Sequence, residues 1–561
     1  MPASANIAQH LPLMAAQQPQ RAALKIPRGR NASGQIDYLT LSFAELEQEV
    51  NAWAIHLQEK GVKTGDRTLV MVRQGLPLIA AAFALFKIGA VPIVIDPGMG
   101  LKSFLSCVAR SRPGVLLGIP FAQLVSRVAR KSFHTVEIRV TASGNPLSRR
   151  AKPGNFGNAI LVHRDSADLA AIFFTSGSTG APKGVCYEHG MFAAQVRLIR
   201  ETYAIEPGEI DLPMLPIFAL FNPALGMTTV VPELDPSKPA TMDPAKIVQA
   251  IQQEHVTNSF GSPTLWGKIA DYCAANKIVL SGMKRVLCAG APVPARLWAQ
   301  SRELLPNGKL HSPYGATESL PISSVSSDEV LPILARQSES IADASGGKGS
   351  AAPVKWGACV GRVVMEIDVK VVAIYEGPMR TLAEVTELAA GEIGEIIVRG
   401  PVVTKSYDAL PDATALAKVA DNGAVWHRMG DCGYRDEEGR LWFCGRKAER
   451  VITPNETLFT EPCEQVFRTL DNVARCALVG LGEKGAQVPA VVFQTARKFS
   501  SAEQQHFAET ARARAKEHAH TAQITRFYFH PAFPVDVRHN AKIHRLTLAK
   551  WAATTQGYPL P

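Results

Sequence analysis

The sequence has no paired cysteine motif, no long uninterrupted apolar run and no internal repeat. Its nine cysteines are scattered through 561 residues and never spaced as Cys-x-x-Cys. A disulfide framework or zinc site is therefore disfavoured, and a reducing cytoplasm is the expected location. The best apolar stretch, residues 76–95, is interrupted by Lys87, Gly89 and Pro92, which predicts a buried helix and a strand with no membrane span. The first residues lack a basic segment followed by an apolar core, so we expect no secretory signal.

Charge is the one unusual property of the composition. The chain has 60 Lys and Arg against 50 Asp and Glu, a net charge of +10, whereas its 46% hydrophobic residues are ordinary for a globular protein. Such an excess is typical of proteins that bind nucleic acid, a membrane surface or an anionic small molecule. Basic residues do not alternate with aromatic platforms, so we expect no nucleic-acid partner. From residue 446 onward there are 16 basic and 10 acidic residues, so much of the excess lies in the last fifth of the chain.

Strand and helix patterns alternate through most of the chain, which predicts an α/β fold. Ser42 and Glu45 form the Ser-x-x-Glu capping box that begins a helix. Residues 68–72, 76–87 and 91–97 predict strand, helix and strand with short connections, the rhythm of a parallel sheet. Further strands are predicted at 114–119, 137–140, 171–175, 229–231 and 285–289.

Two places are predicted to be boundaries. Residues 323–357 are rich in Ser, Gly and Ala and predict a flexible surface excursion. After Gly445 the pattern restarts, with a helix predicted at 501–519 and strands predicted at 475–479, 488–494 and 525–529. We therefore expect a core domain at 1–445 and a mobile C-terminal domain at 446–561.

The segment 171–185, AIFFTSGSTGAPKGV, carries the clearest chemical signal. An apolar strand runs into a loop of Gly and hydroxyl residues with one lysine, Lys183. Glycines let backbone N–H groups approach phosphate oxygens, hydroxyls add donors, and the lysine supplies positive charge. The loop is not a Walker A motif, because Pro182 stands where that motif has the Gly before Lys.

This residue order resembles the phosphate loop of the adenylate-forming superfamily, which includes acyl-CoA synthetases, peptide-synthetase adenylation domains and firefly luciferase. Further motifs follow in the family's order: AGAP at 289–292, YGATE at 314–318, GEIGE at 391–395, WHRMGD at 426–431, GR at 445–446 and NAKI at 540–543. The resemblance covers nearly the whole chain. It implies a large N-terminal domain of layered α/β subdomains and a small α+β C-terminal lid.

The resemblance implies ATP and Mg²⁺ as cofactors and a role for each motif. Lys542 would be the adenylation lysine, and Glu318 and Thr175 would hold magnesium and complete the catalytic set. Asp431 and Arg446 would bind ribose. The other implied nucleotide-binding positions are Ser176, Gly177, Ser178, Thr179, Gly180, Lys183, Gly290, Ala291, Pro292, Tyr314, Gly315 and Thr317. Attack of a carboxylate on the α-phosphate of ATP needs positioning and charge neutralisation, which residues of these types supply.

The chain departs from this family's pattern after Arg446. Many acyl-CoA synthetases read G-R-x-K-D-x-I-x-x-G-G-E-N, whereas this chain reads GRKAERVITPNET, with Pro454 and Asn455 in place of two glycines. In thioester-forming relatives this loop lines the pantetheine tunnel. Because proline fixes φ and removes an N–H, we do not expect the same loop chemistry here. A second departure is Ala219, where relatives often place histidine.

These departures resemble the β-lactone synthetase branch, which serves bacterial long-chain olefin biosynthesis. The resemblance implies that a 2-alkyl-3-hydroxy fatty acid is activated to an acyl-adenylate, whose 3-hydroxyl attacks the acyl carbon. The alternative is a fatty acyl-CoA or acyl-carrier-protein ligase, which shares the first step. A hydrolase and a reductase of the same pathway are the expected protein partners. Apolar character predicts an acyl pocket at Phe218, Phe221, Gly226 and Met227, and His189 and His539 are candidate bases.

Overall fold

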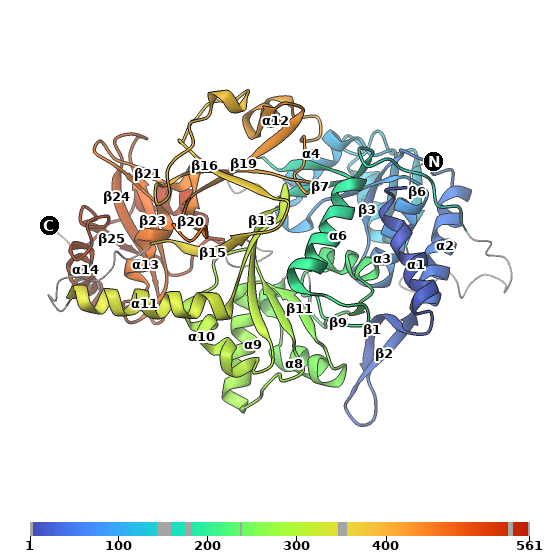
Figure 1. Ribbon diagram of the computed structural model, residues 1–561, viewed down its shortest axis with the longest axis horizontal. Helices are drawn as coiled ribbons and strands as arrows, with labels where there is room; N and C mark the ends of the chain where they lie inside the picture. The colour runs from blue at the N-terminus through green and yellow to red at the C-terminus, as the bar shows by residue number, and fades with distance from the viewer. Residues whose placement is uncertain are drawn as a thin grey trace.

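The computed structural model describes residues 4–142, 159–175, 181–235, 238–345, 356–536 and 542–558. In Figure 1 the N-terminal strands and helices lie on the right, a long central sheet crosses the molecule, and the C-terminal elements lie on the left. The helices pack on the faces of these sheets.

A mainly parallel sheet forms the first part of the chain. Its strands run in the order β6 (Ile138–Thr141), β5 (Val115–Gly118), β3 (Arg67–Met71), β4 (Val91–Val94), β7 (Leu169–Thr175) and β8 (Lys183–Glu188). The crossovers carry α3 (Leu76–Lys87), α4 (Leu101–Ser111) and α5 (Pro120–Val128), as the strand–helix–strand rhythm predicts. Because β3, β4 and β5 are parallel, their carboxyl ends meet at one edge, where open α/β sheets bind ligands.

The central sheet joins the middle of the chain to its two flanks. Its order is β16 (Asp368–Val372), β17 (Gly394–Arg399), β19 (Ala424–Arg435), β20 (Leu441–Arg446), β15 (Ala358–Val363), β14 (Ser319–Ser326), β13 (Lys309–Ala316), β12 (Arg285–Cys288), β11 (Asn258–Gly261), β9 (Ile210–Asp211), β10 (Thr228–Val230), β1 (Ala22–Arg30) and β2 (Ile36–Ser42), with β18 (Lys418–Asp421) beside β19. The helices packed along it are α6 (His189–Tyr203), α7 (Asn222–Leu225), α8 (Pro244–Gln253), α9 (Pro263–Asn276), α10 (Ala295–Leu304), α11 (Ser327–Ser345) and α12 (Pro411–Ala417).

The C-terminal elements have a sheet and cores of their own. The hairpin β21 (Val451–Ile452) and β22 (Thr457–Leu458) precedes a sheet of β23 (Val473–Leu481), β24 (Val488–Thr495) and β25 (Arg526–Phe529). The helices α13 (Thr460–Phe467) and α14 (Ser501–Lys516) contribute to one apolar cluster, and α15 (Arg545–Ala552) contributes to a second. This agrees with the strands and helix predicted after residue 445.

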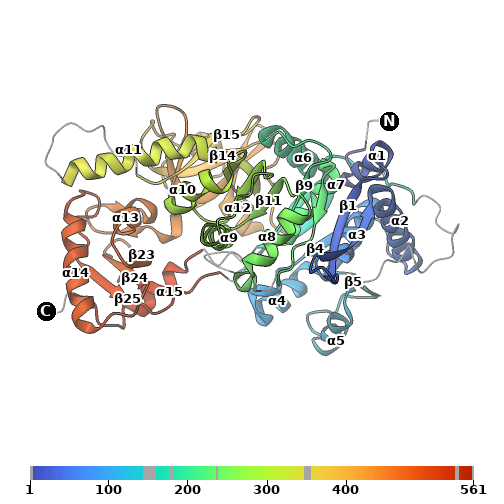
Figure 2. The same cartoon turned by 90° about the horizontal axis from the view of Figure 1, so that it is seen from below.

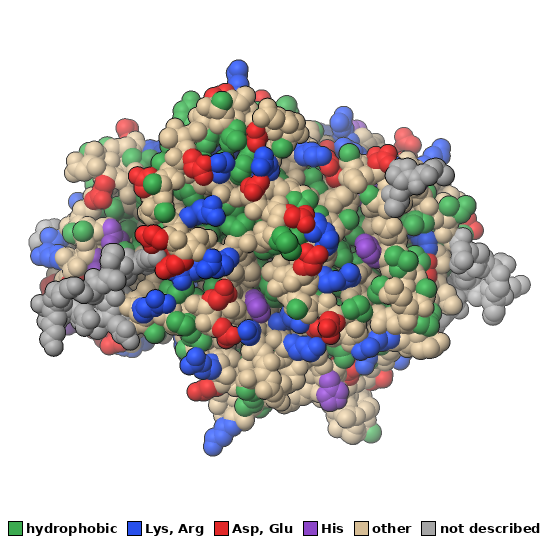
Figure 3. Space-filling model, in the orientation of Figure 1, with side chains coloured by type: hydrophobic (Ala, Val, Ile, Leu, Met, Phe, Trp, Pro, Cys, Tyr) green, Lys and Arg blue, Asp and Glu red, His purple; other side chains and the backbone are tan. Residues whose placement is uncertain are grey.

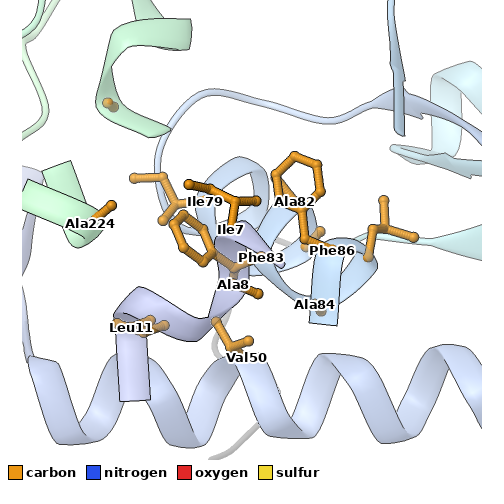
Figure 4. Close-up of a cluster of buried hydrophobic side chains, with 14 of the residues drawn as sticks. Ile7, Ala8, Leu11, Val50, Ile79, Ala82, Phe83, Ala84, Phe86 and Ala224 are labelled. Carbon is orange, nitrogen blue, oxygen red and sulfur yellow. The ribbon is translucent and has the colours of Figure 1, made fainter. Parts of the chain in front are cut away.

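The largest apolar cluster surrounds α3. The helix α2 (Phe43–Glu59) packs both on α3 and on the N-terminal helix α1 (His10–Gln17). The side chains of α3 are buried nearly all round because it lies between helices and sheet. Figure 4 shows Phe83 and Phe86 of α3 beside Ile7 and Leu11 near the N-terminus. The capping box predicted at Ser42 is present at the start of α2.

The prediction of a flexible excursion over residues 323–357 is wrong for much of its length. Residues 319–326 form β14, and the long helix α11 follows immediately (Figure 1). The backbone N–H and hydroxyl of Ser326 both donate to Glu329 Oε2, at 2.8 and 2.7 Å, which is one half of a capping box. None of the described helices is both long and apolar enough to cross a membrane. All nine cysteines lie in the described ranges and are free thiols.

Candidate functional site

A cavity of about 1580 Å³ opens between the carboxyl edge of the first sheet, the central sheet and the C-terminal elements. Residues from every predicted motif in the described ranges line it. They are Lys183, Phe218, Phe221, Gly290, Ala291, Pro292, Tyr314, Gly315, Thr317, Glu318, Asp431, Arg446 and Lys542. Residues more than 350 positions apart in the sequence therefore meet at one site.

One wall of the cavity is built around the Asp431 carboxylate. Asp431 and Arg446 are opposite one another on β19 and β20, with Arg446 Nη1 2.8 Å from Asp431 Oδ1. The Tyr314 hydroxyl donates to Asp431 Oδ2 at 2.7 Å. Burial raises the pKa of the Asp431 carboxyl, while the positive charges of Arg446 and Lys542 oppose that shift. In turn, the Asp431 carboxylate raises the pKa of the Arg446 guanidinium.

A second wall holds Glu318, in the turn between β13 and β14. The Tyr407 hydroxyl donates to Glu318 Oε1 at 2.9 Å, and the backbone N–H of Thr404 donates to the Glu318 carbonyl at 2.9 Å. Lys183 Nζ lies 4.7 Å from the centroid of the Tyr407 ring, a cation–π distance. The phenol therefore connects the phosphate-loop lysine with the carboxylate.

Lys542 reaches the cavity from the C-terminal elements. Its backbone N–H donates to Asp536 Oδ1 at 2.9 Å, and its carbonyl accepts from the Asp536 N–H at 3.0 Å. Three residues later, Arg545 pairs with Glu449 at 3.0 Å and with Glu464 at 2.7 Å. Since Glu449 lies in the short turn of helix after β20 and Glu464 lies on α13, these ion pairs fix the segment after Lys542 to other elements of the C-terminal part.

The apolar end of the cavity contains only part of the predicted acyl pocket. Phe218 and Phe221 line it, and the Phe218 ring stacks on Phe260 with centroids 3.6 Å apart. Gly226 and Met227 do not line it, which corrects that part of the prediction. Gly226 ends α7 with φ of 74° and packs against α1, and Met227 is buried in the core.

Several of the predicted site residues either lie outside the described residues or do not line the cavity. Residues 176–180, the Thr175 side chain and His539 lie outside the described residues. His189 is buried at the start of α6, where its Nδ1 accepts from the Ile7 N–H at 3.4 Å, and it does not line the cavity. Burial lowers the pKa of His189 to about 4, as for a packed histidine of the core.

Comparison with known proteins assigns the family. Residues 13–408 match the family described as AMP-binding enzyme. The chain belongs to that family. It is 41% identical over 98% of its length to an olefin β-lactone synthetase of Stenotrophomonas maltophilia, of which it covers 98%.

Solved structures agree on the fold of this AMP-binding enzyme. ATP-bound MatB from Rhodopseudomonas palustris superposes with a TM-score of 0.76 at 20% identity, over 98% of this chain and 99% of that one. The O-succinylbenzoate coenzyme A synthetase of Bacillus subtilis, in complex with ATP and a magnesium ion, gives 0.74 at 21% identity, over 96% and 98%. The chain thus has the fold of adenylate-forming enzymes. Its family match and its similarity to an olefin β-lactone synthetase make it an AMP-forming ligase.

The donor groups of the AMP-binding enzyme fit a nucleotide and a magnesium ion. Asp431 Oδ1 is buried and, within the described residues, receives no well-directed hydrogen bond, so it can accept one from a ribose hydroxyl. Glu318 offers a carboxylate, the ligand type that Mg²⁺ prefers. The described part of the chain holds no cluster of three or more acidic, His or Cys side chains that could hold a metal ion.

The sequence did not predict a buried pair beside Glu318. Lys418 on β18 is paired in register with His427 on β19, and Lys418 Nζ donates to Thr404 Oγ1 at 3.2 Å. Burial lowers the pKa of Lys418 to about 7 and that of His427 well below its ordinary value. Lys418 Nζ also lies 5.9 Å from the Tyr407 ring centroid, so Lys183 and Lys418 are both near this ring. The signal in the sequence that could have predicted this pair is the spacing of nine residues between Lys418 and His427, which allows two adjacent strands to place them opposite one another.

We expect Tyr407→Phe to weaken the binding of magnesium in the first step. The substitution keeps the ring between the two lysines and removes only the hydroxyl that donates to Glu318 Oε1. The magnesium concentration giving half-maximal ATP–pyrophosphate exchange should rise by about 5- to 20-fold, the loss of one hydrogen bond to a charged group. Affinity for Mn²⁺ in the presence of ATP, followed by electron paramagnetic resonance, should fall in parallel. The matched control, Tyr375→Phe on an exposed loop, should leave both values unchanged.

Proposed function

We propose that this protein activates a long-chain 2-alkyl-3-hydroxy fatty acid with ATP and closes it to a β-lactone. The observation that carries the proposal is the 41% identity to an olefin β-lactone synthetase over 98% of both chains. We also propose Glu318 and Thr175 as the magnesium ligands and assign the nucleotide positions as the motifs predict.

The loop that departs from thioester-forming relatives supports this choice. Residues 453–456 form a closed turn between β21 and β22, in which the Thr453 N–H donates to the Glu456 carbonyl at 3.0 Å. The Thr453 hydroxyl also accepts from the N–H groups of Asn455 and Glu456, at 3.3 and 3.1 Å. A turn closed by its own side chain, with Pro454 inside it, offers no free N–H for a pantetheine arm.

In the proposed first step, a carboxylate oxygen of the acid attacks the α-phosphorus and the bond to pyrophosphate breaks. Lys542 neutralises charge between the carboxylate and the α-phosphate, and Lys183 holds the departing phosphates. Bound Mg²⁺ supplies further charge neutralisation. Asp431 and Arg446 hold the ribose, so the acyl-adenylate stays in place.

In the proposed second step, the 3-hydroxyl oxygen attacks the acyl carbon. The carbon–oxygen bond to AMP breaks, AMP leaves with one carboxyl oxygen, and the hydroxyl proton is released. Because the 3-hydroxyl belongs to the acyl group that it attacks, no second acyl acceptor has to enter the cavity. The cavity wall must only hold the hydroxyl and the acyl carbonyl in contact.

We propose that the hinge follows residue 445 and that residues 446–561 form the lid. The ion pairs of Arg545 with Glu449 and Glu464 lie within this lid and hold the segment after Lys542 to its other elements. A cytoplasmic location is proposed on the nine free thiols, and a hydrolase and a reductase of the same pathway are the proposed partners.

The test is the mass of the product formed by the purified protein with ATP, Mg²⁺ and a long-chain 2-alkyl-3-hydroxy acid. We expect a product lighter than the acid by one water, in equal yield with and without coenzyme A. A thioester that forms only when coenzyme A is present would overturn the proposal and establish a ligase.

A further inference from the structure

The helix α5 exposes large apolar side chains to solvent and buries small and polar ones. Ala122, Gln123 and Ser126 are 1%, 5% and 1% exposed and face the sheet, whereas Phe121, Leu124 and Val128 are 68%, 56% and 78% exposed. The spacing of the exposed three places them on one side of the helix. A surface helix of a soluble protein normally buries its apolar stripe, so this outward stripe has no partner within the described chain.

Hydrogen bonds hold α5 in this orientation. Gln123 Nε2 donates to the Val140 carbonyl on β6 at 2.8 Å, and Arg139 Nε on the same strand donates to the Ser126 hydroxyl at 3.4 Å. A rotation that buried the apolar stripe would break the contact with β6 and place Gln123 in solvent. The contact of α5 with β6 therefore holds the apolar stripe on the surface.

The stripe lies at the mouth of the cavity. The helix α5 begins at the carboxyl end of β5, and α4 begins with Leu101, 68% exposed, after the carboxyl end of β4, which lies two strands away in the same sheet. Phe121 both lines the cavity and faces solvent. Seen from below, α4 and α5 project from the same side of the molecule, α5 furthest (Figure 2).

Positive charge accompanies the apolar side chains. Residues 101–140 contain seven basic residues and one acidic residue, Glu137, so this short segment holds a large share of the net charge of +10. Arg127, Arg130 and Lys131 are exposed on or just after α5, and Lys102 is exposed on α4. On the face shown in Figure 3, by contrast, charges of both signs are mixed.

We propose that α5 and the start of α4 dock on an anionic lipid surface. Exposed Phe, Leu and Val side chains flanked by Arg and Lys are the composition of helices that lie in a membrane interface. One nine-residue helix is small for a stable protein–protein interface, whereas a lipid surface needs only a shallow apolar stripe. Docking there would place the cavity mouth against the phase in which a long-chain acid dissolves; this last point rests on the proposed function.

Vesicle flotation of the full-length protein tests the proposal. The probes are vesicles of phosphatidylcholine alone and of an equimolar mixture with phosphatidylglycerol. We expect binding to the anionic vesicles that falls about tenfold or more in the double variant Leu124→Ser, Val128→Ser. The matched control, Val279→Ser with Met365→Ser, removes apolar side chains that are 50% and 64% exposed elsewhere and should bind like the native protein.

Both variants should retain ATP–pyrophosphate exchange with a short, water-soluble 3-hydroxy acid, since none of the four side chains lines the cavity. Failure of the native protein to float with anionic vesicles would overturn the proposal, as would equal flotation of the double variant. Self-association that the double variant abolishes, without vesicle binding, would instead identify an interface between copies. None of these outcomes depends on which product the site makes.

Discussion

Replacing Lys542 by alanine lowers the rate of ATP–pyrophosphate exchange by about 10²- to 10³-fold and leaves ATP affinity nearly unchanged. Lys542 lines the cavity near enough to Asp431 for its charge to affect that carboxyl, while the contacts proposed for the ribose come from Asp431 and Arg446. We therefore expect the lysine to act on the charge that develops during attack rather than on nucleotide binding.

Lys550→Ala is the matched control for this prediction. Lys550 is an exposed lysine of α15, close in sequence to Lys542 but absent from the cavity wall, and its removal should not change the exchange rate. Exchange at the native rate in Lys542→Ala would refute the assignment. ATP affinity measured by calorimetry separates this loss from misfolding.

The second large effect concerns stability. Arg428→Met should lower the free energy of unfolding by about 3–5 kcal/mol, because it leaves the Glu395 carboxylate buried with only Lys447 as a charged partner. Glu395 and Arg428 are 1% and 3% exposed, and Arg428 also donates to the Gly377 and Leu416 carbonyls at 2.6 and 3.1 Å. Their contacts thus join β17, β19, the helix α12 and the loop that contains Gly377.

Urea denaturation, followed by tryptophan fluorescence, measures this loss. Arg399→Met is the control, because Arg399 is 39% exposed and its pairs with Asp368 and Asp421 should contribute only about 0–1 kcal/mol. Equal losses in the two variants would show that burial does not decide the strength of the Arg428 pair.

Local signals in the sequence predicted much of the fold. The capping box at Ser42 placed the start of α2, and the apolar run at 76–87 matched α3 at both ends. The same signal is present at Ser326 and Glu329, but the Ser, Gly and Ala residues nearby favour a loop, so the sequence did not predict α11. Residues 346–355 of this segment lie outside the described chain.

The motifs predicted residues that meet at one cavity because most of them lie at a strand end or in a turn that faces it, although Asp431 lies within β19. They could not reveal Tyr407, Lys418 or the outward face of α5, since those depend on how distant segments pack. The spacing of Phe121, Leu124 and Val128 alone predicts a buried stripe, and only their exposure shows that the stripe faces outward. Likewise the sequence predicted Gly226 as part of an acyl pocket, although this glycine ends α7 and packs against α1.

The most direct test of β-lactone formation through an acyl-adenylate uses an acid labelled with ¹⁸O in its 3-hydroxyl. The purified protein, ATP and Mg²⁺ are incubated without coenzyme A, and the lactone and AMP are analysed by mass spectrometry. The mechanism predicts a lactone that is lighter by one unlabelled water and retains the label, with unlabelled AMP, because AMP leaves with a carboxyl oxygen. Label in AMP would mean that the hydroxyl was activated instead, and absence of lactone would contradict the proposed reaction.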